Sequence, residues 1–560
     1  MMTNDAPSTQ PAQPALQTPV APAPADARPM TTPPTTDAGS TGPTALTNVY
    51  AVHGADPEVM AYAMAKYSRS ALTMQESLRE LNSQRAEQFL DTFYFQYGHR
   101  SIADLAHVAF AVERLSLLAA IVLLDEQRWD GQERSTRYQD FRKSGWRLPE
   151  FGPDMEAKKL YTESIEGLFA AYEKLSQGAL ALLGQSIAKP AEMEQKAYER
   201  TLRARAFDVA RYLLPLATHT SLGQIVNART LETQISRLLS HTHAEVRHLG
   251  GLLRSAAAAP AWNVQTSALE ALQKKIAALD PALGEEAATL LLRPVKAAPT
   301  LVKYAAPMEY LTKVRPALEQ AAQELLQQER IQPAPLVDLV DGPVGGPNGT
   351  PESLEIEIIT TLLYGACHYP YRQIREHVAA LDATRRNELL LLGTRDRGPH
   401  DELLRAFASG HVFRFDILMD IGGFRDMHRH RRCVQTMQAF TNAHGYEVPE
   451  LIQETPLRAE YEQAVRQAHA AYDQLALSNA PEATATAQYV LPLGTRCRAL
   501  FKMDFAEAAY IAELRSAPQG HISYRRVAWE MYQAIAKRHP VLAQGIRVTD
   551  INAPVDPLQR

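Results

Sequence analysis

The chain has 560 residues, of which 46% are hydrophobic and 22% are charged, and its formal net charge is −5. This length is enough for two or three domains, and the composition is that of a soluble globular protein. The small negative charge excludes a protein that binds nucleic acid or a membrane surface through its overall charge, so any anion site must be local.

The N-terminal 45 residues are rich in Pro, Ala and Thr. Such a segment buries too little apolar surface to offset its ordering entropy, so residues 1–45 are predicted to form a disordered tail. The three cysteines, Cys367, Cys433 and Cys497, are widely spaced and suggest a reducing compartment without a disulfide framework. With no signal pattern and no run of ~20 apolar residues, we expect a cytoplasmic protein that does not cross a membrane.

Residues 46–259 are predicted to form a first domain. Apolar residues recur every three or four positions from Asp56 to Ser68 and from Ser77 to Tyr97, which is typical of helices. Apolar and other residues then alternate over His107–Glu113, as in a half-buried strand, and an apolar helix is expected from Leu115.

Residues 260–340 are rich in Ala, Leu and Glu but are interrupted by prolines, which favours a helical spacer. The Gly- and Pro-rich residues 341–351 are predicted to be a linker. A second domain is expected over residues 352–552, where Phe413–Ile417 alternates as a strand and a helix from Met419 carries a basic cluster.

Two features of the second half repeat features of the first half in the same order. The strand at Val108 is matched by the strand at Phe413, and Tyr-Leu-Leu-Pro-Leu at 212–216 is matched by Tyr-Val-Leu-Pro-Leu at 489–493. The order indicates a duplication. Chance is the alternative, since Leu-Pro-Leu is a common triplet.

The first candidate site is the segment Gln132-Glu133-Arg134-Ser135-Thr136-Arg137-Tyr138. The hydroxyl of Ser135 and the guanidinium of Arg137 suit the oxygens of a phosphate. Glu133 can accept hydrogen bonds from ligand groups such as those of a ribose. The alternative is a surface loop that contains a charge pair.

The second candidate site is Arg425-Asp426-Met427-His428-Arg429-His430-Arg431. A nucleic-acid patch is a weaker interpretation, because this is one short cluster in an acidic chain. A metal site at His428 and His430 is weaker still, because two helical side chains two positions apart point in different directions. There is also no P-loop or Rossmann glycine motif.

Together the two segments resemble the flavin-dependent thymidylate synthases (the ThyX family), whose motif runs R-H-R, a short gap, then N/Q-E-x-S-x-R-Y. Here the two parts of the motif stand almost 300 residues apart, so the chain looks like two diverged ThyX copies in tandem. The resemblance implies an α/β (α+β) fold with two ThyX-like domains, each a twisted antiparallel sheet flanked by helices. It also implies reductive methylation of dUMP to dTMP with FAD as cofactor and with NADPH and methylenetetrahydrofolate as co-substrates.

The resemblance assigns roles to particular residues. Arg515 and Arg425 are expected to be catalytic, and no metal is expected. The residues expected to bind substrate are Glu133, Ser135, Arg137, Arg211 and Arg237. The residues expected to bind the flavin are Ser101, Asn227, Arg229, Arg429, His430 and Arg431.

Each half has lost a different part of the motif. Asp125-Glu126-Gln127 stands where the first half should have R-H-R, and Gln488 stands where the second half should have the phosphate arginine. In this family the site lies between subunits of a homotetramer, so a composite site is expected here, with a homodimer imitating the tetramer. Asp426 in place of Gln and Asp104 in place of Glu keep an alternative open: an inactive nucleotide-binding protein of the same fold, or an enzyme for another pyrimidine nucleotide.

Overall fold

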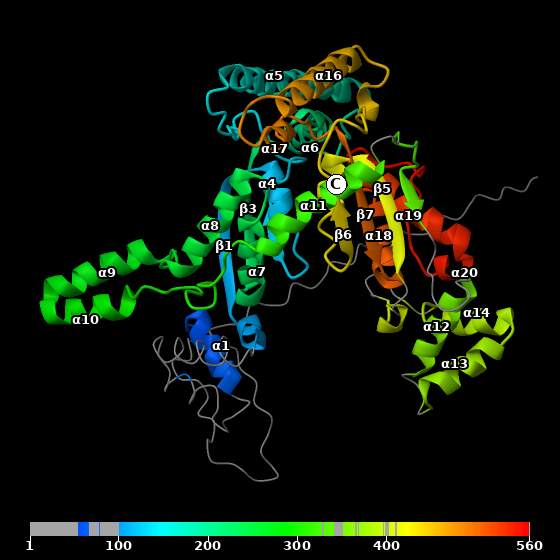
Figure 1. The fold of residues 1–560 in the computed structure, drawn as a ribbon, viewed down its shortest axis with the longest axis horizontal. Coiled ribbons are helices and arrows are strands. Elements are labelled where there is room, and N and C mark those ends of the chain that lie inside the picture. Colours follow the sequence, from blue (N-terminus) through cyan, green and yellow to red (C-terminus); the bar gives the residue numbers. More distant parts are fainter. Residues whose placement is uncertain are drawn as a thin grey trace, which may run out of the picture. The chain divides into compact units, whose positions relative to one another are not determined.

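The chain is organised around two antiparallel sheets, one in each half (Figure 1). The structure is a computed structural model. It describes residues 54–66, 78, 100–326, 330–340, 351–364, 367, 369–395, 397, 403–408 and 412–558. The predicted tail, most of the predicted helix at 77–97 and nearly all of the predicted linker lie outside these residues. Residues Ala55–Arg560 form one compact unit by their contacts.

The N-terminal half contains a three-stranded sheet with the order β1-β3-β2. Its elements are α1 (Pro57–Lys66), η2 (Arg100–Leu105), β1 (His107–Ser116), α4 (Leu117–Leu124), β2 (Asp130–Glu133), α5 (Met155–Ser186), α6 (Gln195–Ala210), η3 (Arg211–Leu213), β3 (His219–Asn227), α7 (Ala228–Leu239) and α8 (Ala244–Ala258). Every residue of α4 is buried, which explains its uniformly apolar sequence.

The predicted spacer is helical and contains α9 (Thr266–Leu279), α10 (Pro281–Leu291) and α11 (Glu309–Leu326). It ends in a short strand, β4 (Val337–Leu339), which pairs with the edge of the second sheet. Three helices, α12 (Pro351–Tyr364), α13 (Tyr371–Ala380) and α14 (Ala383–Leu392), separate β4 from the other strands of that sheet.

The C-terminal half contains a four-stranded sheet with the order β4-β5-β7-β6. Its elements are η4 (Arg405–Phe407), β5 (Phe413–Asp420), α15 (Ile421–Met427), β6 (Val434–Met437), η5 (Glu450–Ile452), α16 (Leu457–Ala476), α17 (Ala483–Gln488), β7 (Arg496–Met503), α18 (Phe505–Ser516), α19 (Ile522–Arg538) and α20 (Pro540–Ala543). The helix expected from Met419 is short, so the basic cluster from His428 onward lies in the turn that follows α15 and not on a helix.

Strands β1, β3 and β2 of the first sheet have the same order and register as strands β5, β7 and β6 of the second sheet. Val108 pairs with Val226 in one sheet, as Phe413 pairs with Met503 in the other. The offset between β3 and β7 is therefore 277 positions (503 − 226). A bulge at Arg114, whose φ is 59°, gives β1 one extra residue. The expected fold, with two antiparallel sheets flanked by helices, is confirmed.

The halves meet where the two repeated segments cross. Pro215 bridges to Pro492 in an antiparallel pair. Leu216 N–H donates to the Leu491 carbonyl at 3.0 Å, and Leu493 N–H donates to the Leu214 carbonyl at 2.9 Å. Exchanging the equivalent residues of the two halves converts one of these hydrogen bonds into the other. The two halves are therefore related by a local twofold axis between Pro215 and Pro492.

One apolar core runs through both halves and includes both sheets. Beyond the crossing, α5 of the first half packs along α16 of the second half (Figure 1). Gly178 on α5 allows this approach, because a Cβ there would collide with Leu457. Within the described ranges, no helix is long and apolar enough to cross a membrane.

Candidate functional site

Arg137 is fixed in the turn after β2 by partners from both halves. Its Nε and Nη2 donate to the two oxygens of Asp208 at 3.0 and 3.1 Å, which is a bidentate pair. Its Nη1 donates to the Tyr524 hydroxyl of α19 at 2.8 Å. Burial lowers the pKa of Arg137, but Asp208 and then Tyr524 more than reverse this effect, so the guanidinium stays charged.

Arg211 begins η3, one turn after Asp208, and its side chain is only 2% exposed. Its Nε lies 3.5 Å from Asp208, and its Nη1 lies 3.7 Å from Asp426 of the other half. Both Nε and Nη2 are buried and have no hydrogen-bond partner among the residues that the structure describes. A buried guanidinium that lacks such bonds is strongly under-satisfied, so this position suits an anionic ligand with several oxygens.

Asp426, the next-to-last residue of α15, is surrounded by cations from both halves. Burial raises the pKa of its carboxyl group, but nearby arginines outweigh burial and lower it. These arginines are Arg211, Arg429, Arg515 and Arg137. We call these four residues the arginine cluster. Solvent reaches it at Arg429, which is 33% exposed, and at Asp426, which is 17% exposed.

A buried ion pair joins the two candidate segments directly. Arg425 Nη2 donates to Glu133 Oε1 at 2.5 Å, and Arg425 Nη1 donates to the Thr136 hydroxyl at 3.3 Å. Arg429 lies 3.8 Å from the other carboxylate oxygen of Glu133. The Glu133 side chain is 1% exposed and that of Arg425 is 6% exposed, so neither group faces solvent.

Arg515, in the last turn of α18, is held by a histidine of the basic segment. Its Nε donates to His430 Nε2 at 2.8 Å. Burial lowers the pKa of His430, so the ring is neutral and its proton must be on Nδ1, which faces Glu507 at 3.7 Å. Arg515 also lies over the ring of Tyr524, 5.4 Å from its centroid.

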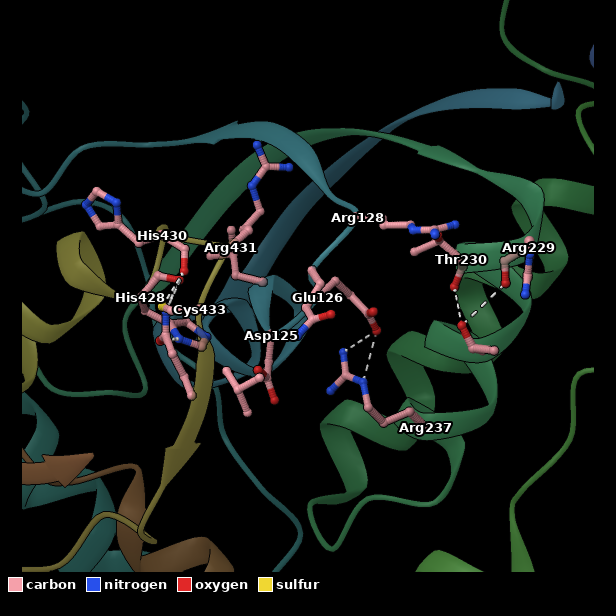
Figure 2. Close-up of a pocket in the computed structure, with 15 residues that line it drawn as sticks. Asp125, Glu126, Arg128, Arg229, Thr230, Arg237, His428, His430, Arg431 and Cys433 are labelled. Atoms are coloured by element: carbon pink, nitrogen blue, oxygen red, sulfur yellow. Dashed lines mark hydrogen bonds and ion pairs between the residues drawn. The ribbon is translucent and has the colours of Figure 1, made fainter. Parts of the chain in front are cut away.

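A second site is a cavity of about 430 Å³ beside α7, which we call the α7 cavity (Figure 2). The C-terminal half contributes His428, His430, Arg431 and Cys433 to its wall. Burial raises the pKa of the Cys433 thiol to about 12, so this sulfur is not a thiolate nucleophile.

The N-terminal half supplies the charged remainder of the α7 cavity. Arg128, Arg229 and Arg237 line it together with Asp125 and Glu126. Figure 2 shows Glu126 and Arg237 directed at each other, and their closest atoms are 2.9 Å apart. With Arg431, four arginines face two carboxylates, and the N-terminal end of α7 adds its positive dipole, so the cavity suits a dianionic group such as a pyrophosphate.

The structure brings most of the expected residues together, in two groups. Arg137, Arg211, Arg429 and Arg515 form the arginine cluster, and Glu133 and Arg425 lie against it. Arg229, His430 and Arg431 line the α7 cavity, and Arg237 lies there too, apart from the substrate group to which it was assigned.

The remaining expected residues have local roles. Asn227 caps α7, and Ser135 accepts a bond from the Arg137 backbone N–H. Ser101 lies in η2, and its side chain is outside what the structure describes.

Three residues that hold the arginine cluster in place were missed by sequence reasoning. Asp208 carried a detectable signal, because it precedes Arg211 by three positions and such spacing places two side chains on one helix face. Tyr524 and His521 carried none, because they reach Arg137 and Asp208 only through the crossing of the halves.

Exchanging the two halves defines a second position that is equivalent to the arginine cluster. This second position lacks the corresponding cations. Shared register makes Gln488 equivalent to Arg211, Leu238 equivalent to Arg515 and Thr441 equivalent to Arg137. Ala485 likewise replaces Asp208. Of the two related positions, only the one built on Arg137 and Arg211 is equipped to hold an anion.

Comparisons with known proteins agree with a duplicated architecture. The family model described as thymidylate synthase complementing protein matches residues 50–260 and 405–541, which together are more than half of the chain. A UPF0159 protein of Chlamydia muridarum is 29% identical over 88% of this chain and 90% of its own length. A UPF0159 protein of Thermoplasma acidophilum is 25% identical over 87% and 94%. A flavin-dependent thymidylate synthase of Clostridium tetani is 25% identical over 36% of this chain and 77% of its own length.

Proposed function

Because the chain belongs to the thymidylate synthase complementing protein family, with two matched segments, we propose that it catalyses the flavin-dependent reductive methylation of dUMP to dTMP at a site shared by its two halves. Methylenetetrahydrofolate supplies the carbon and NADPH regenerates the reduced flavin. In this proposal residues 46–259 and 352–552 are the two copies, joined by the spacer at 260–340 and the linker at 341–351.

The observation that carries the proposal is the buried, under-satisfied guanidinium of Arg211 among the other members of the arginine cluster. A 5′-phosphate would supply the oxygens that Arg211 lacks. Ser135 and Arg137 complete a cradle that suits the tetrahedral shape of phosphate.

The other end of the nucleotide would face the C-terminal half. Arg515, held by neutral His430, is placed to polarise the uracil ring and so to activate its C5 carbon. Arg425 is buried and is paired with Glu133 and Thr136, so we assign it a positioning role in place of the catalytic role expected from the sequence. Arg429, a member of the cluster, lies 3.8 Å from the Glu133 carboxylate.

The α7 cavity fits the flavin dinucleotide by charge. Arg229, Arg431 and Arg128 would hold the pyrophosphate of FAD, with the N-terminal turn of α7 beside them. When bound, the flavin supplies the hydride, and the protein contributes binding and electrostatics. His430 lines the cavity and also accepts the bond from Arg515, so it connects the proposed flavin and nucleotide sites.

Two measurements on the purified chain test the proposal. The protein should show flavin absorbance near ~450 nm and should form dTMP from dUMP, methylenetetrahydrofolate and NADPH, measured by chromatography. Glu462→Gln is the control and should retain activity, because this carboxylate is paired only with Arg458 and Arg466 of its own helix, α16, among the ion pairs of the described residues. A chain that binds neither flavin nor dUMP under these conditions would rule the function out.

A second candidate is a nucleotide-binding protein of the same fold without catalysis. It is favoured by the pairing of the α7 cavity arginines with carboxylates: Arg229 with Asp104, Arg431 with Asp130 and Arg237 with Glu126. This candidate predicts dUMP binding without added absorbance from flavin and without dTMP.

Two copies of the chain in a homodimer would present two arginine clusters, and the molar mass from light scattering tests that arrangement.

A further inference from the structure

Three carboxylates near the arginine cluster differ in how available they are to a ligand. Asp208 receives two hydrogen bonds from Arg137. Glu133 is 1% exposed, its Oε1 is paired with Arg425, and its Oε2 is buried without a hydrogen-bond partner among the described residues. Asp426 is 17% exposed, and its 3.7 Å contact with Arg211 is too long for a hydrogen bond. Of these three described carboxylates, Asp426 is the most exposed, and it is the one that a ligand can reach without displacing a hydrogen bond from a cluster arginine.

Asp426 also interacts electrostatically with arginines from both halves. Arg211 and Arg137 come from the N-terminal half, Arg515 and Arg429 come from the C-terminal half, and all four lower the pKa of the Asp426 carboxyl group. An ionised carboxylate accepts hydrogen bonds and donates none. It repels phosphate oxygens, so the ligand group beside Asp426 must be a donor.

We infer that Asp426 is a specificity residue that accepts a hydrogen bond from a sugar hydroxyl of the bound nucleotide. This inference rests on the proposed function, in which the phosphate faces Arg211 and the base faces Arg515. In a nucleoside monophosphate the sugar lies between phosphate and base, and its hydroxyls are its donors. In a deoxynucleotide such as dUMP that donor is the 3′-hydroxyl.

The negative charge of Asp426 would also make the site discriminate against small anions. Inorganic phosphate fills the cradle of Arg137 and Arg211 but offers no sugar hydroxyl to Asp426, whose negative charge opposes it. Asp426 would thereby weaken binding of free phosphate and favour a nucleotide that brings its own donor.

Calorimetric titration of the full chain tests the inference. The ligands are dUMP, 2′,3′-dideoxyuridine monophosphate and inorganic phosphate. The wild-type chain should bind dUMP about 10-fold or more tightly than the dideoxy compound, because a hydrogen bond to a charged group is strong. Asp426→Asn should reduce this ratio to about 3-fold or less and should bind inorganic phosphate more tightly than the wild-type chain does. Glu462→Gln, which removes a carboxylate between Arg458 and Arg466, is the matched control and should leave both affinities unchanged.

The outcomes separate the inference from the function on which it rests. Equal wild-type affinity for dUMP and the dideoxy compound would overturn the inference while leaving dUMP binding intact, and this comparison needs no variant to fold. Unchanged discrimination in Asp426→Asn would overturn it as well. If no ligand binds any variant, both the inference and the proposed function fail.

Discussion

Arg211 and Gln488 occupy equivalent positions in the two halves, each one residue before the segment that crosses at Pro215 and Pro492. Both side chains are buried, at 1% and 9% exposure. The same backbone therefore places a cation in one copy and a neutral amide in the other. This difference marks one of the two related positions as the anion site.

Arg211→Gln imitates the natural residue of the second copy, so the backbone should accept it. Loss of the buried guanidinium should weaken dUMP binding by about 100-fold or more, since a desolvated charge contact is worth about 2–5 kcal/mol. Calorimetry measures the affinity. The reciprocal Gln488→Arg should create no second site, because Leu238 and Thr441 replace the other cations there. Unchanged dUMP affinity in Arg211→Gln would contradict the assignment of Arg211 to the phosphate.

The buried pair of Glu133 and Arg425 should matter to folding. Glu133→Gln leaves Arg425 buried without its counter-charge, and we expect a loss of about 3–5 kcal/mol in the free energy of unfolding. Replacing both residues, as Glu133→Leu with Arg425→Met, should recover most of that stability. Urea unfolding of the wild type, Glu133→Leu, Arg425→Met and the double variant gives the coupling energy between the two residues. A coupling near zero would show that the pair is not formed.

Much of the fold could be predicted from the sequence because the two halves repeat their patterns. Strand alternation at His107 and Phe413 predicted β1 and β5, and the Leu-Pro-Leu repeats predicted a duplication. The crossing of those repeats could not be predicted, because backbone pairing between segments 277 positions apart leaves no local pattern. The early end of α15 at Met427 was also missed, because the sequence does not show where that helix ends.

The site was predictable only in part, for a related reason. Residues on one continuous segment, such as Glu133, Ser135 and Arg137, could be found because that segment matches the ThyX motif. The partners of those residues come from the other half. Tyr524 and Asp426 complete the cluster only after the halves cross, and Arg237 lies in the α7 cavity because Glu126 and the Val122 carbonyl hold it there.

Acid should destabilise the protein through buried histidines. Burial lowers the pKa of His521 to about 3. The folded chain thus resists protonation while the unfolded chain accepts it. The stability from the neutral ring is complete above about pH 6.5 and is lost as the pH falls below that value, by up to about 1.4 kcal/mol per pH unit.

His521→Asn should remove this part of the pH dependence and keep the cap of α19, since Asn is a good N-cap residue. Urea unfolding between about pH 7 and about pH 5 measures the slope. His248→Asn, at an exposed position on α8, is the control and should retain the wild-type slope. An equal slope in wild type and His521→Asn would show that His521 is not the responsible group.

The crossing of the halves should be sensitive to a single methyl group at Gly494. A Cβ there would lie 3.1 Å from the Tyr212 carbonyl oxygen and would collide with the Tyr461 hydroxyl. Gly494→Ala should therefore lower the free energy of unfolding by about 1–3 kcal/mol. Gly251→Ala on α8, where a Cβ meets nothing within 4 Å, should raise it by about 0.5–1 kcal/mol. If both variants unfold like the wild type, the close approach at Gly494 is not formed.

Arg137→Ala and Arg431→Ala affect different halves and should each abolish dTMP formation, but for different reasons. Arg137 belongs to the arginine cluster, so its variant should lose dUMP and keep flavin. Arg431 lines the α7 cavity, so its variant should lose flavin and keep dUMP. Because the contacts of both residues lie within one chain, a mixture of the two purified variants should remain inactive. Activity in the mixture would instead mean that the halves of different chains assemble each site.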